Sequence, residues 1–123
     1  PKADEAYCNL GVVYMRTNQL QKAELAFRQA ITLNPKYINA YCNLGKTYTL
    51  LKRLPEAVAV YQRTLQVMPQ CAVALADLGA IYLSQQMFRE AEQCLQRSVL
   101  VDQNLGRSFF HLGQLFRATG RVQ

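Results

Sequence analysis

An internal repeat of 34 residues is the feature that most constrains what this chain can fold into. Four Leu-Gly pairs fall into one register along the 123 residues: Leu10-Gly11, Leu44-Gly45, Leu78-Gly79 and Leu112-Gly113. A repeat of this length is one supersecondary unit, which buries its apolar face only by stacking on its neighbours. We therefore expect a stacked array of similar units.

Other positions of the unit keep the same register. A large apolar residue stands three positions before each of these leucines, and an aromatic residue stands three positions after each glycine. Further along come Ala23, Ala57 and Ala91, then Phe27, Tyr61 and Leu95, then Ala30, Thr64 and Ser98, with Pro35 and Pro69 closing the first two units. Apolar spacings of three and four predict two amphipathic helices per unit. Short breaks between them are expected at residues 17–19, 51–53 and 85–87.

This order of residues resembles the tetratricopeptide repeat family, whose unit has 34 residues. The resemblance covers the chain as a single array over residues 1–123, with repeats at 4–37, 38–71 and 72–105 and a partial repeat at 106–123. It implies an all-α, right-handed α-solenoid of stacked antiparallel helix pairs, about three and a half repeats with seven helices. The first helices would line a concave groove. The third unit departs from the pattern, since Gln103 replaces the closing proline.

The repeated glycines need a packing reason. A glycine in a helix interior costs roughly 1 kcal/mol relative to alanine. We interpret glycine on the first helix and alanine on the second as a pair that lets the two backbones approach closely.

Charge and composition exclude several classes. The net charge is +6, yet the basic residues are scattered and Lys52-Arg53 is their only adjacent pair, so no nucleic-acid partner is expected. No apolar run approaches the ~18 residues of a membrane span, so membrane insertion is not expected. The four cysteines form no C-x-x-C pair, which speaks against zinc and redox motifs and mildly favours a reducing, cytoplasmic compartment. Pro1 stands one period before Pro35, so we expect an internal fragment of a longer array.

No catalytic constellation is visible. The chain lacks an H-E-x-x-H motif, a phosphate-binding loop and a nucleophile elbow. His111 is the only histidine and lies two units from Cys42, too far for a nucleophile and its base. We therefore expect no catalytic residue, no cofactor, no metal site and no enzymatic activity.

The resemblance implies that the groove binds an extended peptide or a short helix of a partner protein. The predicted groove residues are Asn9, Val12, Arg16, Asn39, Cys42, Asn43, Lys46, Asp77, Arg107, His111 and Gln114. Asn9 and Asn43 stand one repeat apart, and Asp77 and His111 continue the row. Because an amide both donates and accepts, such a row suits an extended peptide backbone. The alternative is that these amides only tie neighbouring helices together.

Charge in the predicted groove is uneven. Glu5 and Asp77 are acidic, whereas Lys46, Arg107 and Arg117 make the later units basic. An acidic partner opposite the last units would be complementary, and a solvated surface without preference is the alternative. The carboxylate clamp of chaperone-tail receptors in this family is absent, because Cys8 and Val12 occupy the sites of its lysine and asparagine in the first unit. Val73 and Asp77 occupy the sites of its basic residues.

Two other roles stay open. The six-residue segments around Asn9 and Asn43 look like the asparagine ladder of O-GlcNAc transferases, so the chain would be the substrate-recruiting arm of a larger enzyme. Alternatively, open array ends would build a structural scaffold. The last helix, predicted at 106–118, displays Phe109, Leu112, Leu115 and Phe116, and we expect self-association through it.

Overall fold

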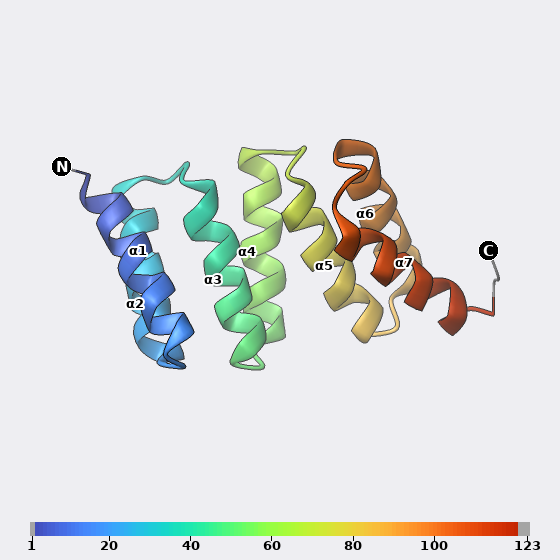
Figure 1. Cartoon of the computed structure of the whole chain (residues 1–123), viewed down its shortest axis with the longest axis horizontal. Helices are drawn as coiled ribbons and strands as arrows, with labels where there is room; N and C mark the ends of the chain where they lie inside the picture. Colours follow the sequence, from blue (N-terminus) through green and yellow to red (C-terminus); the bar gives the residue numbers. More distant parts are fainter. Residues whose placement is uncertain (1, 121–123) are drawn as a thin grey trace. The chain divides into compact units, whose positions relative to one another are not determined.

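The computed structural model describes residues 2–120, and over these residues the chain is α-helical without a strand (Figure 1). The seven helices of this range are α1 (Ala3–Arg16), α2 (Leu20–Leu33), α3 (Ile38–Leu50), α4 (Leu54–Val67), α5 (Ala72–Ser84), α6 (Phe88–Val101) and α7 (Gly106–Ala118). The predicted helix pairs and the all-α helical-repeat fold of the solenoid class are confirmed. The predictions that concern Pro1 and residues 121–123 lie outside the described range.

The three predicted breaks are all left-handed turns that end the first helix of a unit. Their central residues are Asn18, Lys52 and Gln86, with φ of 61°, 64° and 62°. In the first, the N–H of Gln19 donates to the carbonyl of Tyr14 at 2.7 Å, and the N–H of Asn18 donates to Met15 at 3.1 Å. The same two bonds recur in the other turns, which makes each a Schellman motif. Asparagine tolerates this conformation, whereas lysine and glutamine give no signal of it in sequence.

The chain divides into two compact units, Pro1–Val67 and Met68–Gln123. In the first, α1 packs on α2, α2 on α3, and α3 on α4, while α1 also contacts α3 (Figure 1). In the second, α6 packs on α5 and α7, and α5 also contacts α7. Each unit therefore brings two first helices side by side. That the whole chain is one array stays a prediction.

The repeated glycines make room for a large side chain. A Cβ built on Gly45 would lie 2.5 Å from Cζ of Tyr61, whose side chain is almost fully enclosed. Phe27 stands in the same relation to Gly11, and Leu95 to Gly79. The interpretation that glycine faces alanine was therefore wrong about the partner. The close approach is between the glycine backbone and the large residue one turn after that alanine.

A buried carboxylate joins the first two repeats. Glu24 of α2 is 8% exposed and accepts a hydrogen bond from the Tyr48 hydroxyl of α3 at 2.9 Å. Nη1 of Arg53 lies 2.9 Å from its other oxygen, and the Arg53 guanidinium lies 4.7 Å from the Tyr48 ring centroid. Burial and the bond to Glu24 raise the pKa of Tyr48 above its ordinary value. This network holds α2 against α3.

In the second unit a pair of buried hydroxyls ties three helices together. Ser98 of α6 donates to the carbonyl of Ala72 in α5 at 2.8 Å. Its oxygen also lies 2.7 Å from that of Ser108 in α7. Both serines are fully buried, so this chain of bonds satisfies polar groups that would otherwise be costly to bury.

Candidate functional site

The first helices of the first unit present most of the predicted groove residues on adjacent elements. We define the α1–α3 face as Asn9, Val12 and Arg16 of α1 with Asn39, Cys42, Asn43 and Lys46 of α3. All seven are exposed or half-buried. Since α1 and α3 contact each other, the structure brings these residues onto neighbouring helices.

The asparagines of this face have unused hydrogen-bonding groups. Within residues 2–120, the side-chain amides of Asn9, Asn39 and Asn43 make no hydrogen bond, whereas Thr47 and Thr49 on the same helix bond back to carbonyls of α3. The alternative that these amides tie neighbouring helices together therefore finds no support in the described range. Their donors and acceptors are available to a bound segment.

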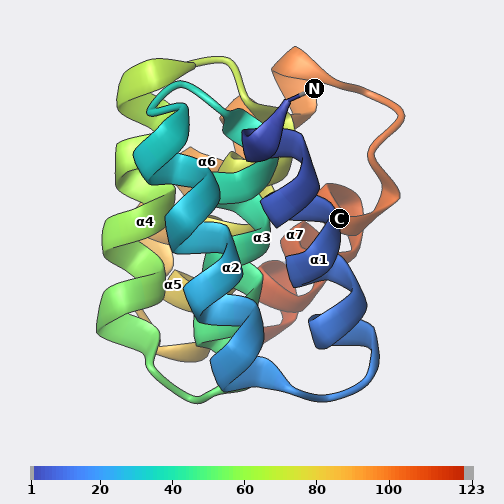
Figure 2. The same cartoon turned by 90° about the vertical axis from the view of Figure 1, so that its left-hand side faces the viewer.

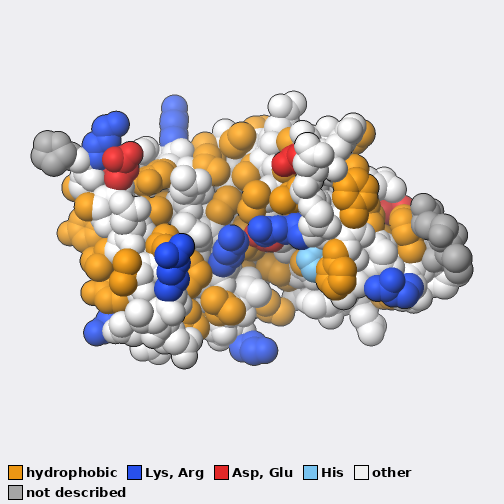
Figure 3. All heavy atoms as spheres, viewed as in Figure 1, with side chains coloured by type: hydrophobic (Ala, Val, Ile, Leu, Met, Phe, Trp, Pro, Cys, Tyr) orange, Lys and Arg blue, Asp and Glu red, His pale blue; other side chains and the backbone are white. Residues whose placement is uncertain are grey.

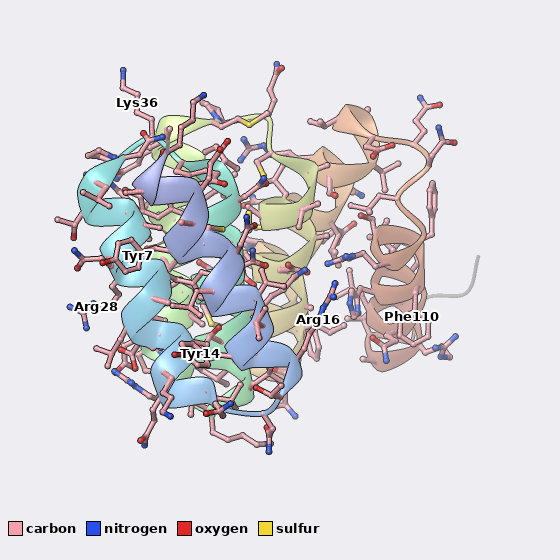
Figure 4. The ribbon with its side chains drawn as sticks, turned by 60° about the vertical axis from the view of Figure 1, so that its left-hand side comes forward. Tyr7, Tyr14, Arg16, Arg28, Lys36 and Phe110 are labelled. Atoms are coloured by element: carbon pink, nitrogen blue, oxygen red, sulfur yellow. The ribbon has the colours of Figure 1, made fainter. Side chains whose placement is uncertain are left out.

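The charges of the α1–α3 face are also unpaired. Neither Arg16 nor Lys46 forms an ion pair with any described residue. In Figure 4 the Arg16 side chain extends from the end of α1 away from α2. Over α1 and α3 in Figure 3, the blue side chains are separate and do not form a continuous patch. This face therefore offers separate cationic contacts.

Cys8 of α1 is buried, unlike the residues of the α1–α3 face. Cys8 is 3% exposed, and it lies beside the Tyr37 side chain. The pKa of Tyr37 is raised, mainly because its hydroxyl is partly removed from water and secondly because of the neighbouring Cys8 thiol. Cys42, one repeat later, is half-buried and has a partner of its own, and all four cysteines are free thiols. Cys8 therefore belongs to the packing under the face.

The second unit brings Asp77 and Arg107 into contact. Nη1 of Arg107 in α7 donates to Oδ1 of Asp77 in α5 at 2.8 Å. From the sequence, the two residues were predicted to be separate charges of opposite sign, with Asp77 midway along the predicted groove and Arg107 near its end. Because they neutralise each other, this part of the face is less polarised than the sequence suggests.

The second unit also has a shallow groove of about 380 Å³. Its lining residues are Ala80, Leu83, Ser84, Gln86, Phe88, His111, Gln114 and Ala118. Nδ1 of His111 lies 2.9 Å from Oε1 of Gln114, an arrangement in which the ring N–H donates. Phe110, which is 59% exposed, packs edge-on against His111 with 5.4 Å between ring centroids.

The structure thus places Asp77, Arg107, His111 and Gln114 on one face of the second unit. The sequence did not point to Gln86 and Phe88 as lining residues, because they belong to the turn and to the second helix. Residues 2–120 contain no cluster of three or more potential metal ligands. In the same range, no helix combines the length and apolarity that crossing a bilayer requires.

This geometry defines a helical-repeat protein with polar first-helix faces, and comparison with known families makes the class specific. Residues 4–37 and 37–104 match family models described as tetratricopeptide repeat. The chain belongs to the tetratricopeptide repeat family, as the resemblance predicted. Repeats of this family generally mediate protein–protein interaction and are typically non-catalytic. No curated protein matches the chain.

Several solved structures share the fold. The TPR domain of Arabidopsis OM64 has a TM-score of 0.89 and 18% identity, covering 94% of this chain and 96% of that one. The first TPR of Spaghetti (RPAP3), bound to the HSP90 peptide SRMEEVD, has a TM-score of 0.90 and 16% identity, covering 96% and 94%. MamA has a TM-score of 0.79 and 25% identity, covering 86% of this chain and 62% of MamA.

Proposed function

We propose that the chain is a non-catalytic module that binds an extended peptide or a short helix of a partner protein on its first-helix faces. The observation that carries this proposal is the free amides of Asn9, Asn39 and Asn43. Helices in contact lie about 8 to 10 Å apart. An extended peptide rises ~3.3 Å per residue. Amides one repeat apart would therefore meet backbone groups about three residues apart on the bound segment.

The second unit adds a place for an apolar side chain of the partner. Ala80 and Leu83 supply apolar lining to the groove there, while His111 and Gln114 supply hydrogen-bonding groups. A few polar groups on a mostly apolar lining are typical of sites that orient a bound group. We propose that the second unit, taken by itself, binds a bulky apolar residue of a partner segment in this groove.

The peptide bound by the Spaghetti (RPAP3) domain supports our proposal that the ligand of this chain is a peptide, but it does not support the same peptide sequence. That peptide ends in Glu-Val-Asp and so carries carboxylates, which cationic groups complement. Here Cys8 and Val12 occupy the corresponding clamp sites, and Cys8 is buried. We therefore propose a different segment for this chain, and SRMEEVD serves as a negative control.

The test uses a displayed library of random 12-residue peptides selected on the full chain. Each selected peptide is then measured by calorimetry against Asn9→Ala/Asn43→Ala. A net hydrogen bond contributes about 0.5–1.5 kcal/mol, so loss of two amides should weaken binding by about 1–3 kcal/mol, or roughly 5- to 150-fold. The matched control removes exposed amides of second helices, Gln66→Ala/Gln93→Ala, and should leave affinity unchanged. Equal affinity of the asparagine variant and the wild type would overturn the proposal.

A second role, self-association through α7, is favoured by one observation. Of the residues predicted to be displayed on this helix, Phe109 is 51% exposed, although it occupies the register of the buried Tyr41 and Leu75. The prediction was wrong for Leu115, which is fully buried because it packs inside the second unit, whereas Phe110, next to Phe109, is 59% exposed. Large exposed apolar side chains in a cluster mark interaction surfaces. We expect concentration-dependent sedimentation, reduced by Phe109→Gln and not by the control Leu100→Gln on α6. A strict monomer at high concentration excludes this role.

A further inference from the structure

The charges on the first-helix faces differ between the two units. From the sequence, an acidic partner was expected opposite the last units, but Arg107 is already paired with Asp77 at 2.8 Å. In the first unit, Arg16 and Lys46 form no ion pair with any described residue. An acidic group of a bound segment is therefore complementary to the α1–α3 face.

One stripe of α1 carries charges of opposite sign at its two ends. Glu5, Asn9, Val12 and Arg16 follow one another at spacings of four, three and four residues, so they lie on one side of the helix. Glu5 is in the first turn of α1 and Arg16 is in the last, and Figure 2 shows α1 running from the N label at the top toward the bottom of the view. At a rise of ~1.5 Å per residue, the two residues lie about 16 Å apart along the helix axis.

The carboxylate of Glu5 is available to a partner. Glu5 is exposed and forms no ion pair with a described residue. Its neighbour Asp4, in contrast, accepts a hydrogen bond from Nδ2 of Asn34 at 3.0 Å. The pKa of Tyr37 is raised mainly by removal from water and then by Cys8, and the negative charge of Glu5 adds to this effect. Since Tyr37 directly precedes α3, Glu5 lies toward the α3 side of α1.

The equivalent stripe of α3 places a cation beyond the amides. Asn43 and Lys46 stand one period after Asn9 and Val12, on a helix that contacts α1. Contacting helices lie about 8 to 10 Å apart, and Lys46 is about 10 Å further along its helix than Glu5 is along α1. Glu5 and Lys46 are then about 14 Å apart, a distance that an extended chain spans in about four residues. The amides of Asn9 and Asn43 lie between them.

We propose that the partner segment bound on the α1–α3 face carries a basic side chain that pairs with Glu5 and, about four residues away, an acidic side chain that pairs with Lys46 and Arg16. This inference rests on the peptide-binding function proposed above and adds the chemistry of the ligand to it. The occupant is an internal segment of another protein, because the charges lie on both sides of the amides and the bound chain continues past them in both directions. The amides hold the backbone, and the two charges select the sequence.

The test starts from a displayed library of random 12-residue peptides, each flanked on both sides by fixed neutral residues so that no free terminus is offered. Peptides selected on the full chain should be enriched, relative to the unselected library, in a basic and an acidic residue about four positions apart. One such peptide is then synthesised with blocked ends and measured by calorimetry against the wild type and three charge-reversal variants.

Lys46→Glu should weaken binding of this peptide about 2- to 30-fold, because the attraction of an exposed ion pair is replaced by a repulsion of similar size. Replacing the acidic residue of the peptide by lysine should restore binding to Lys46→Glu and weaken binding to the wild type. Glu5→Lys, at an exposed position, should behave in the same way toward a peptide whose basic residue is replaced by glutamate. The matched control is Arg63→Glu, exposed on α4, which should leave the affinity unchanged.

Several results would overturn the proposal. The first is a set of selected peptides without the two charges at this spacing, and the second is a charge-swapped peptide that fails to restore binding to both Lys46→Glu and Glu5→Lys. An equal loss for Arg63→Glu would mean that only net charge matters. Binding only by a version of the peptide with a free carboxyl terminus would make a chain end the occupant. If Asn9→Ala/Asn43→Ala weakens binding while the charge reversals do not, peptide binding stands and this inference fails.

Discussion

Adding one methyl group to Gly45 should destabilise the first unit, although alanine is the better helix former. In a helix interior, the change from glycine to alanine gains about 1 kcal/mol. The new Cβ would, however, lie 2.5 Å from Cζ and 2.7 Å from Cε1 of Tyr61, which is 1% exposed. A ring enclosed on all sides has no free space to move into.

The magnitude follows from these two opposing effects. Overpacking a core typically costs about 1–3 kcal/mol. The atoms that the new Cβ would contact belong to the rigid ring of Tyr61 and not to the flexible end of a side chain, so a small side-chain movement does not relieve the contact. Because the Tyr61 ring is enclosed, we take the upper part of this range, about 2–3 kcal/mol, and expect a net loss of about 1–2 kcal/mol for Gly45→Ala after the helix gain of about 1 kcal/mol is subtracted. Gly113→Ala is the matched control in the same register of α7, where the nearest atom is the flexible end of Arg117 at 3.7 Å. It should stabilise by about 0.5–1 kcal/mol.

Urea unfolding followed by circular dichroism measures both changes, and residue-resolved hydrogen exchange assigns each to its own unit. A double-mutant cycle with Tyr61→Ala checks the cause. The cost of the added methyl should shrink when the ring is gone. If Gly45→Ala is as stable as the wild type, or if its cost persists in the Tyr61→Ala background, the explanation of the repeated glycines is refuted.

Two further predictions concern the network of Glu24, Tyr48 and Arg53 and the left-handed turn at Lys52. Tyr48→Phe should cost about 1–3 kcal/mol at neutral pH, because Glu24 stays buried and loses a donor. Since the folded pKa of Tyr48 is raised above 10.0, its contribution is complete below the unfolded pKa and is lost as pH rises through the folded pKa. Denaturation curves from pH 7 to 11 should show a smaller alkaline loss in Tyr48→Phe, and an unchanged loss contradicts this. Lys52→Gly should stabilise by about 0.5–1 kcal/mol by relieving a φ of 64°, with exposed Gln66→Gly in α4 as a destabilising control. Equal destabilisation by both in thermal scans would contradict it.

Much of the fold follows from local signals in the sequence. The three breaks at 17–19, 51–53 and 85–87 agree with the helix bounds, because the apolar period of a helix is interrupted where the helix ends. The predicted last helix at 106–118 coincides with α7 for the same reason. The left-handed turns at Lys52 and Gln86 were not predictable, since neither residue prefers that conformation.

The sequence predicts which first-helix residues share a face, but not the ion pairs and the burial of the residues on that face. Register alone indicates that Asn9 and Asn43 share one face, because they stand one period apart. Register does not indicate that Arg107 forms an ion pair with Asp77 or that Cys8 is buried. Both features depend on how separate helices pack.

The sequence by itself determined the repeat, the helix pairs and the family, because a fixed period repeats the same local preferences in every unit. The tertiary structure decided which copy of a repeated residue is buried: Tyr41 is covered by a neighbouring helix, whereas Tyr7 in the same register is exposed. It also decided which charges meet, as in Glu24 with Arg53. The physical reason is that exposure and ion pairing are properties of contacts between helices far apart in the chain, and identical local patterns have different neighbours.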